Sequence, residues 1–167
     1  AKAGVRTTQG LAYGMANAIR PGKTPLSSMS PTIVMKDGKP VLSVGAAGGP
    51  RIITSTLQLI INNLDYGMMM DSAVKHPHMC CLTLNQGLEL EEGFSPDTIR
   101  LLAAKGHIIK NTTDFGELLV MPNGIRNIDG TLFPGGTSRV DGGGGALTAS
   151  GTMAIDGLCF IDEKLTK

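Results

Sequence analysis

Two short stretches of this sequence carry the residue types needed to hold a carboxylate and a developing negative charge. The first is residues 25–32, where Ser27 and Ser28 offer two hydroxyl donors on a loop framed by prolines. The second is the pair Gly48 and Gly49, directly before a long apolar stretch. N–H groups at the start of a helix favour negative charge, and glycine lets a substrate approach the backbone closely. The glycine pair is therefore a candidate oxyanion hole, with a hinge for tight helix–strand packing as the alternative.

A β-hairpin is predicted between these two stretches. Residues 32–35 and 40–44 read as strands, and Asp37-Gly38 supplies the turn between them. Both strands are apolar at nearly every position, which predicts burial on both faces, as in a layered α/β architecture. The pattern leaves open whether the hairpin brings the two stretches to the same sheet edge or to opposite edges. The alternative to a binding role for Ser27 and Ser28 is a structural one, because serine in a loop with prolines is often only a turn residue.

Three helices are predicted around this hairpin. The longest covers about residues 51–66, with Pro50 at its first position. A short helix is predicted over residues 71–75. A third begins after the N-cap Ser95 and ends at Gly106. The long helix carries an apolar face made of Ile53, Leu57, Ile60, Ile61 and Leu64.

Short strands and turns are predicted in the second half of the chain. Residues 88–91 alternate Leu and Glu, which predicts a strand with one face in water. The glycine-rich residues 134–145 lack the spacing of a phosphate-binding loop and predict a flexible or tightly turned segment near a sheet edge. Further strands are predicted at residues 108–109, 118–121 and 158–161, and turns at residues 122–124 and 129–130.

The bulk composition excludes several functional classes. The 167 residues carry a net charge of +1 and no basic run, so no nucleic-acid partner is expected. No apolar run approaches the ~18 residues needed to cross a bilayer. Neither a metal nor another cofactor is expected, since His76, His78 and His107 lack metal-site spacing. The odd cysteine count predicts free thiols instead of a disulfide framework at Cys80, Cys81 and Cys159.

Four motifs together resemble the γ-glutamyltransferase (glutathione hydrolase) family. They are P-L-S-S-M-S-P-T at residues 25–32, K-D-G-K at 36–39, G-G-P-R at 48–51 and G-F-S-P-D-T at 93–98. The resemblance is to the C-terminal part of the small, catalytic subunit. It covers residues 1–147 and leaves a tail, residues 148–167, without an assigned role. It implies an α/β fold, the N-terminal-nucleophile hydrolase αββα sandwich, of which this chain would form a partial domain.

The resemblance also implies roles for individual residues. Ser27, Ser28 and Met29 would bind substrate, with the two serines on the α-carboxylate of a γ-glutamyl group. Gly48 and Gly49 would bind the oxyanion. The reaction implied is cleavage of a γ-glutamyl amide such as glutathione, with transfer of the γ-glutamyl group to water or an amine acceptor. The location implied is periplasmic or extracellular.

The nucleophile of that family, the N-terminal Thr of the small subunit, is expected to lie outside this chain. Thr7 precedes Ser27 by only 20 residues, too few for that role. The partners expected are therefore the large subunit and the N-terminal part of the small subunit. Two alternatives remain open. One is a catalytically silent, light-chain-like binding or structural protein, and the other is a related amidohydrolase or acylase with a different amide substrate.

Overall fold

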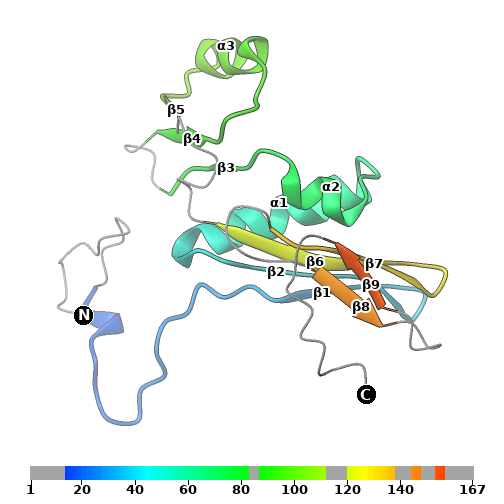
Figure 1. The fold of residues 1–167 in the computed structure, drawn as a ribbon. Coiled ribbons are helices and arrows are strands. Elements are labelled where there is room, and N and C mark those ends of the chain that lie inside the picture. The colour runs from blue at the N-terminus through cyan, green and yellow to red at the C-terminus, as the bar shows by residue number, and fades with distance from the viewer. Residues whose placement is uncertain (1–13, 83–86, 112–119, 138–143, 148–152, 157–167) are drawn as a thin grey trace.

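The computed structural model describes residues 14–82, 87–111, 120–137, 144–147 and 153–156. Its largest sheet is antiparallel throughout. In order across the sheet, the strands are β1 (Thr32–Lys36), β2 (Lys39–Ala47), β6 (Met121–Ile128) and β7 (Thr131–Gly135). Two helices, α1 (Ile52–Leu64) and α2 (Met70–Lys75), lie along one face of this sheet (Figure 1).

The β1–β2 hairpin forms as predicted. Its turn residues Asp37 and Gly38 have φ angles of 50° and 74°, the left-handed conformation that an Asp-Gly turn adopts. Thr32 pairs with Val44 across the hairpin. The chain therefore enters β1 and leaves β2 at the same end of the sheet, opposite the turn.

The prediction that both hairpin strands are buried on both faces is wrong. On β2, Leu42 and Val44 are buried while Ser43 between them is exposed. On β1, Ile33 and Met35 are 64% and 54% exposed. The reason is that α1 and α2 cover one face of the sheet, so residues pointing to the other face are not enclosed by them.

The main core lies between the helices and the sheet. A Cβ added to Gly124 would lie 2.9 Å from Met70 Sδ, and one on Gly135 would lie 2.6 Å from the Met70 carbonyl carbon. Glycine thus allows α2 to approach β6 and β7 closely. The turn predicted at residues 122–124 is wrong, because these residues pair with β2 inside β6. The core consists of Leu42, Val44, Leu59, Met70, Ala73 and Val74.

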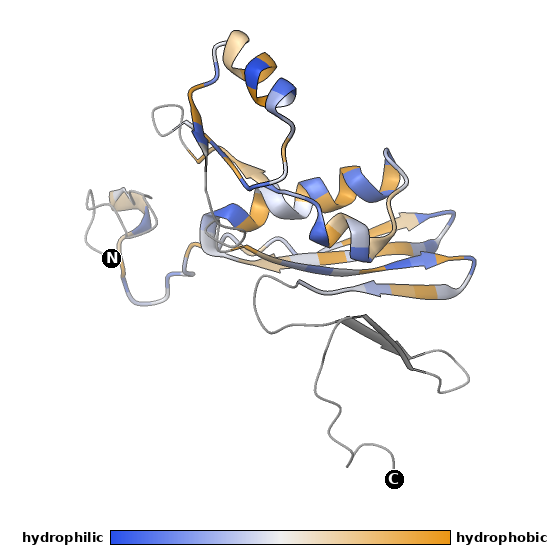
Figure 2. Ribbon diagram, turned by 45° about the horizontal axis from the view of Figure 1, so that its top comes forward, coloured by the Kyte–Doolittle hydropathy of each residue, from blue (hydrophilic) through white to orange (hydrophobic). Residues whose placement is uncertain are grey.

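The long helix forms close to its predicted ends, but its buried face differs from the predicted one. Of the predicted apolar face, Ile53, Leu57 and Leu64 are 55%, 52% and 45% exposed. Two of the polar side chains that face inward have partners, since Ser55 Oγ lies 2.9 Å from His78 Nδ1 and Asn63 Nδ2 donates to the Leu59 carbonyl at 2.9 Å, whereas the Thr56 hydroxyl is buried without a hydrogen-bond partner. Figure 2 shows hydrophobic residues, coloured orange, among hydrophilic ones on the helices above the sheet. The buried residues of α1 are Ile52, Ser55, Thr56, Leu59 and Asn63.

A smaller sheet joins β3 (Met79–Cys80), β4 (Leu88–Leu90) and β5 (Ile109–Asn111). β4 and β5 are parallel and are connected through α3 (Pro96–Ala104). The predicted start and end of α3 are confirmed. Ser95 Oγ accepts a hydrogen bond from the Thr98 N–H at 3.1 Å, and Gly106 follows the helix with a φ of 93°.

The prediction that residues 88–91 keep one face in water is wrong. Glu89 and Glu91 are only 6% and 2% exposed. Each carboxylate has a partner that permits burial. Glu89 faces Arg51, and Glu91 Oε2 accepts a hydrogen bond from the His78 N–H at 2.7 Å.

The remaining described elements are η1 (Met15–Asn17) and a hairpin of β8 (Gly144–Leu147) and β9 (Met153–Asp156). The turn at residues 129–130 is confirmed by φ angles of 51° and 90°. Residues 118–119, 158–161 and most of the glycine-rich segment between β7 and β8 lie outside the described residues, as does Cys159. Within the described part of the chain, no helix is long and apolar enough to cross a membrane.

Candidate functional site

The serine loop, residues 25–31, meets the glycine pair at the open end of the β1–β2 hairpin. The Ser28 hydroxyl donates a hydrogen bond to the Gly49 carbonyl oxygen at 2.9 Å. The two candidate stretches therefore lie at the same edge of the sheet, one of the two arrangements that the sequence pattern allows. The register of the hairpin is the cause, since Thr32 and Val44 are paired and each stretch lies a few residues beyond them.

Short-range hydrogen bonds shape the serine loop. Ser27 Oγ accepts from the Met29 N–H at 3.2 Å, so the hydroxyl proton of Ser27 is not used in this contact. The Ser30 hydroxyl donates to the Ser28 carbonyl at 3.2 Å, and the Thr32 hydroxyl donates to the Ser30 carbonyl at 3.1 Å. Ser27 and Met29 are exposed, whereas Ser28 is half-buried. The loop thus presents one hydroxyl outward and holds the other against the glycines.

The glycine turn leads directly into a helix. Gly48 has a φ of 144° and a ψ of 29°, and Gly49 has a φ of 60°, so both adopt conformations that favour glycine. The short helix η2 (Gly49–Arg51), with Pro50 buried inside it, continues into α1. Among the described residues, none of the backbone hydrogen bonds of turns, loops and helix caps uses the amide of Gly48 or Gly49. Two donors at the positive end of a helix are the elements of an anion site.

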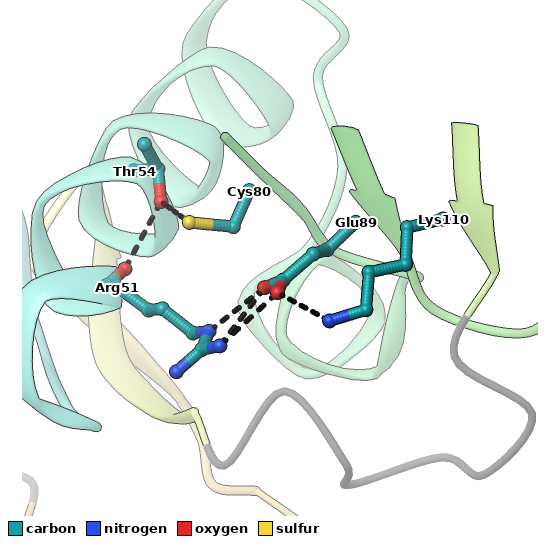
Figure 3. Close-up of polar contacts among 5 residues, drawn as sticks. All are labelled: Arg51, Thr54, Cys80, Glu89 and Lys110. Carbon is teal, nitrogen blue, oxygen red and sulfur yellow. Dashed lines mark hydrogen bonds and ion pairs between the residues drawn. The ribbon is translucent and has the colours of Figure 1, made fainter. Parts of the chain in front are cut away.

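An ion-pair cluster that the sequence did not predict surrounds the side chain of Arg51, two residues after Gly49 in the chain (Figure 3). Arg51 Nε lies 3.0 Å from Glu89 Oε2, and Arg51 Nη2 lies 3.3 Å from Glu89 Oε1. Lys110 Nζ contacts the same carboxylate at 3.4 Å. Because Glu89 alternates with leucines, the sequence pattern predicts that its side chain faces water, and for this reason the ion pair was not predicted. The available signal was an arginine directly after Gly-Gly-Pro and an acid inside an otherwise apolar strand.

Cys80 is a buried thiol beside this cluster. Its Sγ lies 3.4 Å from the Thr54 hydroxyl, and its side chain is buried. Burial raises the pKa of the Cys80 thiol above its ordinary value, and the Thr54 hydroxyl and the Arg51 charge offset only part of that effect. Cys81 is exposed, and neither Cys80 nor Cys81 forms a disulfide with another described residue.

A buried Ser–His pair joins the first turn of α1 to the residue before β3. Ser55 Oγ and His78 Nδ1 are 2.9 Å apart, and both residues are 1% exposed. The carboxylate of Glu91 accepts a hydrogen bond from the backbone N–H of His78 at 2.7 Å. The pair is explained as packing between α1 and β3. No group of three or more metal-binding side chains occurs among the described residues.

A surface hollow of about 710 Å³ lies at the turn end of the hairpin, between Lys36, Asp37 and Asn127. This is the end opposite the serine loop and the glycine turn. Its lining includes none of the candidate residues, so the candidate site is the junction of the two loops and not this hollow. Thr7 lies outside the described residues.

Comparison with known proteins gives the family. The family model for Gamma-glutamyltranspeptidase matches residues 1–144. The chain is 47% identical over 127 residues to the glutathione hydrolase proenzyme of Escherichia coli strain K12, covering 74% of this chain and 22% of that protein. It is 35% identical over 149 residues to the acylase ACY 1 proenzyme of Pseudomonas sp. strain V22, covering 88% of this chain and 25% of that protein.

Solved structures agree with these matches. A Helicobacter pylori gamma-glutamyltranspeptidase mutant superposes with a TM-score of 0.74 at 36% identity, covering 84% of this chain and 76% of that chain. The likeness confirms the predicted α/β fold of the N-terminal-nucleophile hydrolases. The chain spans about a fifth of the length of the curated E. coli relative (22%). Its motifs, its fold and the match over residues 1–144 establish that the chain belongs to the gamma-glutamyltranspeptidase family.

Proposed function

We propose that this chain is the C-terminal part of the catalytic subunit of a γ-glutamyltransferase, or glutathione hydrolase. The complete enzyme would cleave γ-glutamyl amide bonds and transfer the γ-glutamyl group to water or an amine. The observation that carries the proposal is the 2.9 Å contact between Ser28 Oγ and the Gly49 carbonyl. It supports the proposal because a candidate carboxylate donor then lies beside the candidate oxyanion amides, in a chain of the matching family.

In this proposal the serine loop holds the substrate and the glycines stabilise the reaction. Ser27, Ser28 and Met29 contact the α-carboxylate end of the γ-glutamyl group. Ser27 has a hydroxyl proton to donate, whereas the single proton of Ser28 is engaged with Gly49 and must turn toward the carboxylate to bind it. The amides of Gly48 and Gly49 donate to the oxygen that becomes negative at the scissile carbonyl.

The nucleophile is supplied by another part of the enzyme. The hydroxyl oxygen of an N-terminal Thr attacks the γ-carbonyl carbon, and the α-amine of that Thr takes the proton. The C–N bond then breaks, and the leaving amine carries the proton away. Water or an acceptor amine attacks the resulting ester, which releases glutamate or the transfer product and restores the Thr hydroxyl.

The partners proposed are the large subunit and the N-terminal part of the small subunit. The relatives are named proenzymes, and this chain spans 22% of the first of them. The exposed apolar side chains on β1 and α1, such as Ile33 and Leu57, support packing against further protein. By the same family resemblance, we place the enzyme in the periplasm or outside the cell, with glutathione as the model substrate and no need for a metal.

A second candidate is an acylase, favoured by the 35% identity to the acylase ACY 1 proenzyme over 88% of this chain. The two candidates differ in whether the substrate needs an α-amino acid end. A γ-glutamyl anilide and a glutaryl anilide differ only in the α-amino group. Turnover of the first and not the second by the complete, cleaved enzyme supports the γ-glutamyltransferase. Preference for the glutaryl compound supports the acylase, and no turnover of either overturns the enzymatic proposal in favour of a silent binding protein.

The carboxylate role is tested by Ser27→Ala and Ser28→Ala in the same enzyme. Loss of a hydrogen bond to a charged group costs about 1.5–3 kcal/mol, so KM for the γ-glutamyl anilide should rise about 10- to 100-fold. Ser43→Ala is the matched control, because Ser43 is an exposed serine on β2 between the two stretches. An unchanged KM in both loop variants would refute the role of the serines.

A further inference from the structure

The segment directly before the serine loop folds back through a tight turn. The Lys23 N–H donates a hydrogen bond to the Arg20 carbonyl at 3.2 Å, and Gly22 has a φ of 74°. With Pro21 at the second position and glycine at the third, this is the pattern of a type II turn, whose first and fourth Cα atoms lie within about 7 Å of each other. Arg20 and Lys23, which open and close the turn, are therefore neighbours.

The side chain of Lys23 also holds the chain that precedes the turn. Its ammonium donates to the Ala16 carbonyl oxygen and, at 3.4 Å, to the Ala18 carbonyl oxygen. An ammonium carries three protons, so one remains after these two contacts. Arg20 is exposed, and the ion pairs within the described part of the chain use neither Arg20 nor Lys23. Both cations therefore keep donors available to a ligand.

The turn borders a hollow of about 340 Å³, the cationic hollow, which is lined by residues 17–20 and 23–26. Two of its lining residues, Pro25 and Leu26, belong to the serine loop itself. The first acidic residue of the sequence is Asp37, so neither the lining nor the segment around it contains a carboxylate. Two cations without an acid in the same hollow attract an anion.

The cationic hollow lies within reach of a peptide whose other end is held by the serine loop. Lys23 precedes Ser27 by four residues, which span at most ~14 Å of extended chain. The two carboxylates of a tripeptide such as glutathione lie about 10 Å apart when the peptide is extended. A substrate whose α-carboxylate contacts the serines can therefore bring its second carboxylate to the side chains of Lys23 and Arg20.

We propose that the cationic hollow binds the free carboxylate of the peptide on the amine side of the scissile bond. This inference rests on the proposed function. The leaving peptide of cleavage and the acceptor peptide of transfer both present an amine nitrogen to the same carbonyl carbon, so one site serves both. The guanidinium of Arg20 suits this ligand, because its parallel N–H groups can donate to both carboxylate oxygens. The competing explanations are that the cations are only solvated, or that they contact the α-carboxylate of the γ-glutamyl group.

Transfer from a γ-glutamyl anilide to two acceptors separates these explanations in the complete enzyme. The acceptors are diglycine and diglycine amide, of which only the first carries a terminal carboxylate. In Arg20→Gln, the acceptor KM for diglycine should rise about 3- to 10-fold, as expected for a charge pair in an open hollow. The acceptor KM for diglycine amide and the hydrolysis of the anilide without acceptor should each stay within about twofold of the wild type.

Two variants and added salt test whether the effect depends on the charge at this place. Arg100→Gln is the matched control, because it removes an exposed arginine from α3 and changes the net charge equally. Arg20→Lys keeps the charge but loses the planar two-point contact, so it should raise the KM for diglycine less than Arg20→Gln does. Salt should raise the KM for diglycine more in the wild type than in Arg20→Gln, because it screens an exposed charge pair.

The outcomes distinguish this inference from the function on which it rests. A wild-type enzyme that does not turn over the anilide overturns both. An active wild type whose KM for diglycine is unchanged in Arg20→Gln overturns the carboxylate site alone. The same conclusion follows if the KM rises equally for diglycine and its amide, or rises as much in Arg100→Gln. A higher KM for the anilide itself in Arg20→Gln would assign Arg20 to the α-carboxylate and also overturn the proposal.

Discussion

Replacing either glycine of the turn by alanine should slow catalysis more than it destabilises the protein. Gly48 has φ 144° and ψ 29°, a combination that is essentially restricted to glycine, while Gly49 lies in the left-handed region at φ 60°. An alanine at Gly48 costs about 1–3 kcal/mol of strain. An alanine at Gly49 costs about 1–2 kcal/mol. The chain can relieve either strain by rotating the turn, which moves the amides.

The expected kinetic loss follows from the proposed oxyanion role. Removing one oxyanion donor costs about 3–4 kcal/mol of transition-state stabilisation, which is roughly a 100- to 1000-fold fall in kcat. Gly48→Ala should be the more damaging variant, because its backbone conformation is less accessible to alanine. KM should change little, since the ground-state carbonyl makes weaker contacts with the amides than the oxyanion does.

Gly38→Ala provides a matched control. Gly38 has a φ of 74°, close to that of Gly49, and a Cβ there would meet nothing within 4 Å. It carries the same kind of backbone penalty at the opposite end of the hairpin. The assay is kcat on a γ-glutamyl anilide, with thermal melting of each variant. If Gly48→Ala and Gly49→Ala lower kcat no more than Gly38→Ala, the glycines are only a hinge and the oxyanion role is refuted.

Two further predictions concern packing and thiol chemistry. Gly135→Ala places a Cβ 2.6 Å from the Met70 backbone and should lower the free energy of unfolding by about 1–3 kcal/mol in urea titrations. Gly45→Ala is the control, because a Cβ there meets nothing within 4 Å and should leave the free energy of unfolding unchanged. Equal free energies of unfolding for the two variants would contradict the close approach of α2. Burial raises the pKa of Cys80, so less thiolate is present at a given pH, and alkylation followed by mass spectrometry at neutral pH should label Cys81 first. Labelling of Cys80 at the same rate would contradict this prediction.

Local signals in the sequence were sufficient for elements whose causes are local. The Asp37-Gly38 turn and the Ser95 cap each depend on residues within a few positions, and both form as predicted. Bringing the serine loop to the glycine turn depends on the register of the hairpin. That register follows from strand pairing and could not be fixed from the loops themselves.

Features that depend on distant partners were not predictable in the same way. The Arg51–Glu89 pair joins residues 38 positions apart, and this pairing, with Lys110 on the same carboxylate, permits the burial of a glutamate that looks solvated in the sequence. Gly124 looks like a turn residue in the sequence. In the structure, the missing side chain of Gly124 lets Met70 of α2 contact the sheet, and the residues next to Gly124 in the sequence give no sign of this contact.

The α1 helix illustrates why hydrophobic periodicity and burial are separate properties. The period of 3.6 residues correctly predicts a helix, but the face with Leu57 is turned outward, and the opposite face carries Leu59 into the core and Ser55 against His78. Ser55 faces inward because its partner His78 lies 23 residues away along the chain, while the neighbouring Thr56 hydroxyl is buried without a hydrogen-bond partner. Each Å² of apolar surface that this outward face exposes to water costs about 25 cal/mol of free energy. In a chain that spans 22% of a relative, such a face fits the proposed assembly better than it fits the chain's own core.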